Sequence, residues 1–573
     1  MAFPGTDLDI IIRAYLGADP TAAPGTWPAA TDLSSRLLRQ PIQIRRGRGK
    51  GQKTASAGGC VFWLDNTDGA LTPTLVSSAY YPDWDLGVPM DVSVDNVGTA
   101  PPYVRFAGFA VDIKMVMVPG PGGQNISAVQ VTLGGVVRRL TQGAVEKSAL
   151  FRTMTGLNAA AVPIAYWPLE SEGTLASVLA TATEGGVDGT VSANLILGSS
   201  TSPPAGSAGA VSFESDINTL TDDFRLRITS YTATTHVVTT HVRQSMDDAP
   251  SGTEQILGII GWDVDGTLNT SVSAADMSIS WYGGIGLNPT ALQFQANNAA
   301  LTLTVAMDVS DGEWHEIQVR ATQNGANVDF ELWVDGSLGD SDTSASKTVG
   351  KITQFRGIGG IPLDGTGSPL DGTILLGICH FSLHGDASVG QFYDAMGGYL
   401  GEEAYTRFDR VCAEEGIPYS GTATGSVTMG PQPVADVIAV LRDCEDVDHG
   451  MLIEDFAFGL DYRSSRQREN LPPTMTVDLS TYKTTSGTQA DVLTPTRNDA
   501  RIRNEWSIGR PDGVTRTAKD EAHQAKRGRY NDSATVNVET DDDTLQEAYW
   551  RVHEGTFEGL RYDTMPLDLG ANE

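Results

Sequence analysis

Turn-forming dipeptides recur along this chain and constrain its fold more than any other sequence feature. Asp-Gly and Asn-Gly pairs supply the positive backbone φ angles that tight hairpins need, and segments of alternating apolar and polar residues flank them. The chain has 63 glycines and 28 prolines, and such pairs occur at Asp68-Gly69, Asp265-Gly266, Asn324-Gly325, Asp335-Gly336 and Asp371-Gly372. This pattern predicts antiparallel sheets and a mainly β protein.

The length of 573 residues is too great for one hydrophobic core and indicates about three to four domains. Short strands in residues 1–155 predict a small barrel or sandwich. Period-two strands joined by turn signals predict two stacked sheets of the jelly-roll type within residues 156–392. After residue 393, helical spacing at 402–416 and 433–444, followed by strands and a final helix around 543–554, predicts an α+β domain.

Acidic residues dominate the charge balance: 71 Asp and Glu stand against 39 Lys and Arg, and the formal net charge is −32. Such a field repels phosphate backbones, so we expect no sequence-specific nucleic-acid binding. We expect neither a signal peptide nor a membrane span, because the first residues lack a basic segment and no apolar run is long enough. The cysteines are widely spaced, which predicts buried thiols in a protein folded in a reducing cytoplasm: Cys60, Cys379, Cys412 and Cys444.

The middle segment resembles laminin-G-like and concanavalin A-like sandwich domains. Tyr166-Trp167-Pro168-Leu169 is similar to their opening strand, and Asp311-Gly312-Glu313-Trp314-His315 to a frequent "DGxWH" turn. Phe330-Glu331-Leu332-Trp333-Val334-Asp335-Gly336 resembles the hairpin that follows. Alternation predicts Leu332 and Val334 on one face and Trp333 on the other, with a tight turn at Asp335-Gly336.

The two flanks of this segment resemble minor tail or tail-tip hub proteins of long-tailed actinobacterial phages. Before it, the similarity lies in Leu64 to Pro73, Tyr80-Tyr81-Pro82, Arg105 to Phe109, Val137 to Gly143 and Ser148 to Arg152. Behind it, the similarity lies in Gly401 to Ala404 with Arg407, Glu415 to Pro418, Met429 to Gln432, Gly459 to Arg463 and Ala548 to Arg551.

This resemblance implies hub-type β-barrel domains at both ends, built from residues 1–155 and 393–573, with the sandwich of residues 156–392 inserted between them and projecting outward. It implies a structural virion protein at the tail tip, usually a homotrimer, assembled in the cytoplasm of the host bacterium. The expected partners are the tube end, the distal tail ring and the tape measure protein. A distal tail ring protein with a lectin-like insert is an alternative within the same class.

Two tyrosines of the sandwich segment, Tyr231 and Tyr282, are the candidates for carbohydrate binding, because an outward-facing ring stacks well on a sugar. The alternative for both is ordinary packing. We expect Trp167 and Trp333 in the core and His315 in a structural turn rather than in a ligand site.

No catalytic, metal or cofactor site emerges from the sequence, so we expect a non-catalytic protein. A retaining glucanase on this fold needs two carboxylates about 5 Å apart, and residues 166–383 hold no E-x-D-x-x-E strand to supply them. Gly-x-Ser-x-Gly, Walker and Rossmann motifs are absent. Asp65 and Asp68 lack the glutamate of an EF-hand and predict a turn. The alternatives are a polysaccharide-degrading tail enzyme and a free extracellular adhesin.

A basic cluster stands out against the acidic whole, with Arg45, Arg46 and Arg48 at its centre. One interpretation is an interface with an acidic neighbouring protein or with DNA leaving through the tail. The other is a solvated strand edge whose charges discourage mispairing. We favour the protein interface.

Overall fold

The computed structural model describes residues 9–47, 54–96, 99–119, 124–156, 162–170, 178–183, 186–191, 196–197, 202–216, 224–228, 235–246, 254–264, 277–284, 291–296, 301–307, 311–344, 349–357, 373–385, 391–421, 426–469, 495–496, 499–557, 559 and 561–562. Most of its regular structure is strand, and almost all strand pairs are antiparallel, which confirms the mainly β prediction. None of the helices in these ranges has the length and apolar character of a membrane-spanning helix.

The chain divides into two compact units. The flank unit contains Met1–Val145, Gly401–Gly430 and Asp436–Glu573, and the sandwich unit contains Glu146–Leu400 and Pro431–Ala435. The first unit is therefore discontinuous in sequence, since the second is inserted into it. The predicted division into three domains stays a prediction.

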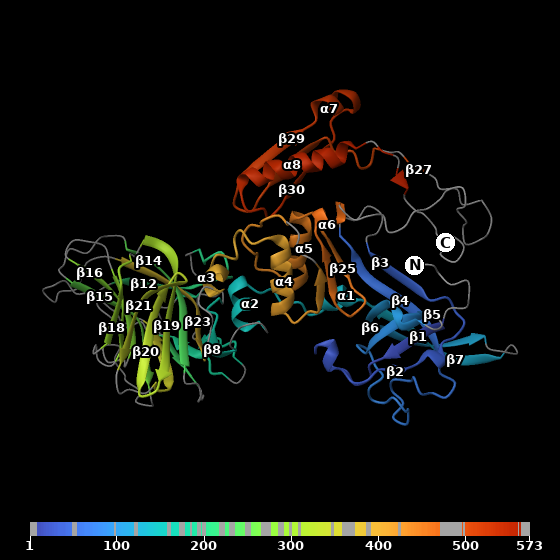
Figure 1. The fold of residues 1–573 in the computed structure, drawn as a ribbon, viewed down its shortest axis with the longest axis horizontal. Helices are drawn as coiled ribbons and strands as arrows, with labels where there is room; N and C mark the ends of the chain where they lie inside the picture. The colour runs from blue at the N-terminus through green and yellow to red at the C-terminus, as the bar shows by residue number, and fades with distance from the viewer. Residues whose placement is uncertain are drawn as a thin grey trace. The chain divides into compact units, whose positions relative to one another are not determined.

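The N-terminal part of the flank unit is a seven-stranded antiparallel sheet in the order β2-β1-β5-β6-β7-β4-β3 (Figure 1). Alternation decides its inner face, because Cys60, Phe62 and Leu64 of one strand are fully buried while their neighbours are partly exposed. The strands are β1 (Asp9–Ala14), β2 (Thr31–Asp32), β3 (Gln43–Gly47), β4 (Ser56–Asp65), β5 (Pro89–Asn96), β6 (Thr99–Pro119) and β7 (Asn125–Gly134).

The predicted hub-type barrels are wrong, because the sheets of the described residues stay open. In the N-terminal sheet, β2 and β3 are free edges, and the loop between β4 and β5 covers the core instead. Leu71 and Trp84 of this loop are buried in that core, and Trp84 Nε1 donates to the Leu71 carbonyl at 2.9 Å. At the C-terminal end, the sheets have two or three strands, too few to close.

The sandwich unit consists of two eight-stranded antiparallel sheets. Both contribute to one core, in which Leu292 and Phe294 of the first sheet join Val319 and Phe330 of the second. The first sheet contains β18 (Leu301–Val305), β17 (Ala291–Ala296), β16 (Met277–Gly284), β15 (Glu254–Val264), β22 (Ile352–Gly357), β13 (Phe224–Arg227), β10 (Gly189–Val191) and β9 (Val178–Leu179). The second contains β11 (Ile196–Leu197), β12 (Val211–Asp216), β23 (Thr373–His384), β14 (Thr235–Met246), β19 (Asp311–Asn324), β20 (Asn327–Val334) and β21 (Ser337–Ser344), with β8 (Pro163–Trp167) on β23.

The hairpin of β20 and β21 confirms the predicted alternation. Leu332 and Val334 are buried in the sandwich core, whereas Trp333 is partly exposed on the other face. The core position expected for Trp333 is therefore wrong, while Trp167 lies in the core as expected. Asp335 and Gly336 have φ angles of 48° and 70°, so they form the tight turn. The pairs at Asp265-Gly266 and Asp371-Gly372 lie outside the described residues.

Two short helices, α2 (Ala149–Thr155) and α3 (Gln391–Met396), cover the outer face of the second sheet. Leu150 and Met154 of α2 pack with Phe392 and Ala395 of α3 and with Val237 of β14 in a second, smaller apolar cluster. The first and last segments of the sandwich unit thus meet in one packed layer.

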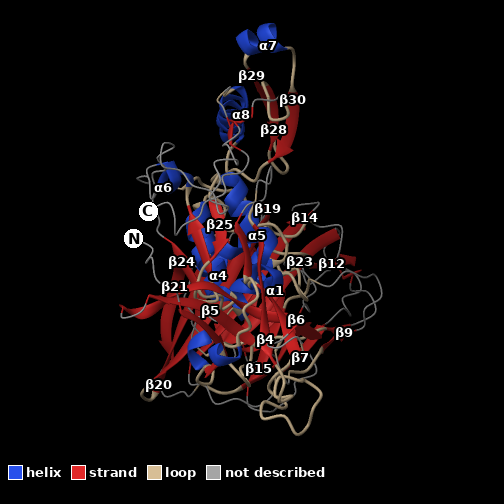
Figure 2. Ribbon diagram, turned by 90° about the vertical axis from the view of Figure 1, so that its right-hand side faces the viewer, coloured by secondary structure: helices blue, strands red, loops and turns tan. Residues whose placement is uncertain are grey.

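The C-terminal part of the flank unit is α+β, as predicted. The helices expected at 402–416, 433–444 and 543–554 are α4 (Ala404–Glu414), α5 (Val437–Val447) and α8 (Asp541–Thr556). α5 begins later than expected because the Asp436 carboxylate caps it, accepting from the Ala439 amide. α8 packs along β28 (Glu505–Gly509) and β29 (Thr515–Lys519), and β30 (Asn531–Thr535) pairs with β28 (Figure 2). The other elements are α1 (Val136–Leu140), β24 (Tyr419–Gly421), β25 (Met451–Glu454), β26 (Leu460–Arg463), α6 (Ser465–Glu469), α7 (Glu521–Arg527), β27 (Pro495–Thr496) and β31 (Arg561–Tyr562).

Candidate functional site

The structure places only part of the predicted carbohydrate site. Tyr231 lies outside the described residues. Tyr282 lies on β16, where its backbone pairs with Ile256 of β15 and Ala291 of β17. The proposed sugar contact of these two tyrosines stays a prediction.

The structure likewise describes only part of the predicted basic interface. Arg45 is exposed on the edge strand β3, and Arg48 lies outside the described residues. Arg46 is half-buried: its guanidinium donates to the carbonyls of Glu454 and Asp455 and lies 4.0 Å from the centre of the Phe456 ring. Burial lowers the pKa of Arg46, against the opposing effect of Glu454 and Asp455. Arg46 therefore contacts other parts of the flank unit, and the interface role of Arg45, Arg46 and Arg48 stays a prediction.

Glu454, at the end of β25, joins the C-terminal part of the flank unit to the N-terminal sheet. Its carboxylate is buried and accepts from the amides of Gly58 and Val137, each at 2.9 Å. A Cβ at Gly58 or Gly135 would approach this carboxylate to 2.3 Å or 2.1 Å, so a side chain at either place would displace it. Burial raises the pKa of Glu454, although the two amide hydrogen bonds oppose the shift. We call this arrangement the Glu454 clamp.

An aromatic cluster forms a second joint between the same two parts. Phe458 lies edge-on to Trp27 at 4.9 Å between ring centres, and to Tyr15 at 5.7 Å and Phe109 at 5.8 Å. Phe109 belongs to β6 and Tyr15 directly follows β1, whereas Phe458 belongs to the turn between β25 and β26. Residues more than 340 positions apart therefore share one aromatic core.

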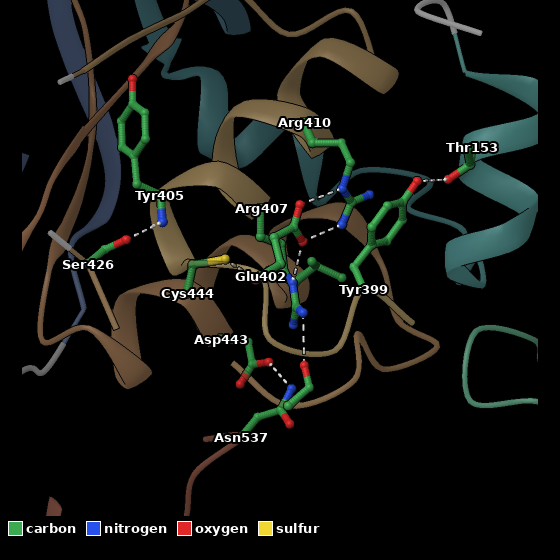
Figure 3. Close-up of polar contacts among 12 residues, drawn as sticks. Thr153, Tyr399, Glu402, Tyr405, Arg407, Arg410, Ser426, Asp443, Cys444 and Asn537 are labelled. Atoms are coloured by element: carbon green, nitrogen blue, oxygen red, sulfur yellow. Dashed lines mark hydrogen bonds and ion pairs between the residues drawn. The ribbon is translucent and has the colours of Figure 1, made fainter. Parts of the chain in front are cut away.

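A buried charge network fixes the segment in which the chain returns to the flank unit. Figure 3 shows Glu402 between two guanidinium groups: Arg407 Nε donates to it at 3.0 Å, and Arg410 donates to both of its oxygens at 2.8 Å. Arg407 is fully buried and also donates to the Gly430 carbonyl at 2.8 Å. The start of α4 is thereby tied to the strand-like segment at 428–430.

The sandwich unit holds a buried group that superficially resembles a catalytic triad. Ser207 Oγ and Glu170 Oε1 lie 2.8 Å and 3.0 Å from His380 Nε2, and the Tyr166 hydroxyl lies 2.6 Å from His380 Nδ1. A triad needs serine and acid on opposite ring nitrogens, and here both meet the same one. Burial would raise the pKa of Glu170, but His380 and hydrogen bonds lower it to about 2. The geometry is that of a closed packing network.

His315 links the two motifs that carry the resemblance to laminin-G-like domains. Its ring nitrogens lie 2.8 Å from Asp335 Oδ2 and 3.2 Å from Asp311 Oδ1, and the other Asp335 oxygen accepts from the Glu316 amide at 3.0 Å. Burial opposes protonation of His315, yet the two carboxylates raise its pKa. This contact explains why the turn and the hairpin occur together, and it agrees with a structural role for His315.

The remaining predictions for single residues concern cysteines and metals. All four cysteines are buried free thiols, as expected. Asp68 forms an ion pair with Arg36 at 2.7 Å, and Gly69 has a φ of 72°, so this segment is a turn. Within the described ranges, no group of three or more His, Cys, Asp or Glu residues is arranged to hold a metal ion.

No protein-family model and no curated protein matches the sequence. Matching solved structures include the binding domain of botulinum neurotoxin DC in complex with SialylT, with 12% identity, a TM-score of 0.28, and coverage of 41% of this chain and 53% of that chain. The type G receptor-binding domain has 10% identity, a TM-score of 0.28, and coverage of 42% and 52%. The chain spans about half the length of these structures. At such scores the likeness establishes neither a shared fold nor a shared activity.

Proposed function

We propose that this chain is a structural, non-catalytic subunit of a phage tail tip, of the hub or minor tail type, and that its sandwich unit binds carbohydrate on the host surface. The observation that carries the proposal is the discontinuous flank unit, with the sandwich unit inserted into it. The motifs that resemble tail-tip proteins lie on both sides of the insertion, and the Glu454 clamp and the aromatic cluster bring these sides together.

The contacts of the motif residues support the same proposal. Phe109 ends one of the tail-tip-like segments, and Phe458 precedes another, at Gly459 to Arg463. Their rings lie 5.8 Å apart. A Cβ at Gly459 would approach the Pro418 carbonyl oxygen to 2.4 Å, and Pro418 belongs to a third such segment. Segments that each resemble tail-tip proteins only weakly in sequence thus contact one another in one packed unit.

The non-catalytic part of the proposal rests on the two histidine networks of the sandwich unit. His380 and His315 are both buried and have both ring nitrogens engaged by neighbouring side chains. Neither ring has a nitrogen directed at an open site, as a general base requires. In the proposed tail tip the chain works by scaffolding, and weak sugar contacts gain strength because several copies bind together.

Gold-labelled antibodies against the full chain, applied to tailed particles that carry it, test the location. The proposal predicts label at the distal end of the tail, and label on the capsid would contradict it. Light scattering of the purified chain tests the copy number: a homotrimer has about 182 kDa, three times the chain mass of 60.8 kDa. Release of reducing sugar from host cell-wall glycans by the purified chain would contradict the non-catalytic role and favour the polysaccharide-degrading alternative.

A further inference from the structure

A cavity of about 350 Å³ lies over the outer face of the seven-stranded sheet. The short helix η1 (Pro24–Thr26), its neighbour Trp27 and the turn at 456–458 line it together with residues of the sheet. The side chains that matter for its chemistry are Arg13, Tyr15, Trp27, Asp91, Phe456 and Phe458. No motif of the tail-tip or sandwich resemblance accounts for an open space here.

The polar side of the cavity is a fixed ion pair. Arg13 and Asp91 face each other across β1 and β5, and Arg13 Nε lies 3.0 Å from both Asp91 oxygens. The Tyr15 hydroxyl donates to Asp91 Oδ2 at 3.1 Å. Burial and the Asp91 charge raise the pKa of Tyr15, so this hydroxyl keeps its proton. Asp91 is 2% exposed, and its oxygens already accept from Arg13, Tyr15 and Ser93. Arg13, whose side chain is 33% exposed, is therefore the member of this neutral pair that can donate to a ligand.

The apolar side of the cavity is aromatic and held in place. Trp27 Nε1 donates to the carbonyls of Asp19 and Ala22 at 3.0 Å and 3.1 Å, which fixes the indole. Phe458 packs edge-on against Trp27. Phe456 is 50% exposed although the Arg46 guanidinium stacks on its ring, so a large apolar surface remains open at the rim.

We propose that this cavity binds one pyranose ring of a neutral glycan. A pyranose has an apolar C–H face for the aromatic side and hydroxyl oxygens that accept from the exposed part of Arg13. Asp91 neutralises the charge of Arg13, so an anionic ligand gains little there, and a cationic one would meet the exposed guanidinium. A proline-rich peptide would suit the rings but would cover the exposed part of Arg13 with an apolar surface, without replacing its water contacts. The inference does not depend on the proposed tail-tip role, and the site is separate from the carbohydrate contact proposed for the sandwich unit.

Saturation-transfer NMR on the full chain tests the proposal, with the methyl glycosides of D-glucose, D-galactose and D-mannose as neutral probes. D-glucuronic acid serves as the anionic probe, and a proline-rich decapeptide as the competitor. The expected result is saturation of at least one neutral glycoside, a weaker signal for the acid, and no displacement by the peptide. Absence of binding by all three neutral glycosides would overturn the proposal, and so would displacement by the peptide.

Two variants locate the binding. Gly25 lines the cavity, and a Cβ there meets no atom within 4 Å, so Gly25→Leu adds an apolar side chain to the lining without crowding at its Cβ and should abolish binding. Phe456→Ala should weaken it about 2- to 12-fold, the range expected for one aromatic contact. Phe557→Ala, which removes an aromatic side chain that is 70% exposed outside the cavity lining, is the matched control and should leave binding unchanged. Binding that persists in both cavity variants, with their unfolding temperatures unchanged, would overturn the proposal.

Discussion

Removal of the Glu454 carboxylate tests whether the two flanks fold as one unit. In Glu454→Ala, the Gly58 and Val137 amides lose their acceptor at a buried place. Each buried donor left without a partner costs about 1–3 kcal/mol, so the flank unit should lose about 2–6 kcal/mol of unfolding free energy. Glu454→Gln keeps one acceptor oxygen but turns an amide group toward the second donor, so the expected loss of unfolding free energy is about 1–3 kcal/mol.

Two measurements check this prediction. Equilibrium denaturation should rank Glu454→Ala as less stable than Glu454→Gln, and both as less stable than the control Glu521→Gln. Glu521 pairs with Lys519 at an exposed place, where an ion pair contributes about 0–1 kcal/mol. Hydrogen exchange should become faster in the peptides that contain Gly58 and Val137. If both Glu454 variants match the control in stability and in exchange, the reasoning about the clamp is refuted.

Three further predictions concern the rest of the chain. Burial raises the pKa of Glu316 to about 8, well above its ordinary 4.5. The folded sandwich unit therefore keeps a proton that the unfolded chain loses, and its free energy of unfolding falls as pH rises from about 4.5 to 8. Glu316→Gln should flatten that pH dependence and stabilise the unit at pH 8 by roughly 3–6 kcal/mol. Thermal unfolding at pH 5 and 8 measures this, and an unchanged dependence of stability on pH would contradict it. Arg407→Met leaves the buried Glu402 with only Arg410 as an ion-pair partner and should lower the unfolding free energy of the flank unit by about 3–5 kcal/mol. Urea denaturation measures this, and a loss below about 1 kcal/mol would argue against the network. Gly336→Ala places a side chain at a φ of 70° and should lower the unfolding free energy of the sandwich unit by about 1 kcal/mol relative to the control Ser337→Ala. Equal stability of the two variants would disprove the turn assignment.

Local signals in the sequence predicted much of the fold. The β20–β21 hairpin followed from alternation around one Asp-Gly pair, because burial on one face and a positive φ are decided within a few residues. The helices α4 and α5 followed from their apolar spacing. The helix α8 was expected at 543–554, and its capping box with Thr540 makes it begin two residues earlier.

Contacts between distant segments were not predictable in the same way. Alternation shows which face of a strand is buried, but not whether the edges of a sheet meet, and the barrel prediction failed because Trp84 and its loop cover the core. Glu454 looks like any strand residue in sequence, and the glycines that make room for it, Gly58 and Gly135, were the only available signal. The cavity beside Phe456 arises where two loops meet, so no local pattern marked it.

Excision of the sandwich unit tests most directly whether the flanks form one module. Sites for a specific protease are inserted after Val145 and after Leu400, two exposed residues at the ends of the sandwich unit, so that α2 and α3 leave the flanks with it. The cleaved protein is separated by size under native conditions. If residues before the first site and after the second elute together as one complex, the flanks hold each other through contacts such as the Glu454 clamp. If the two flanking fragments elute separately, the single-module account is contradicted.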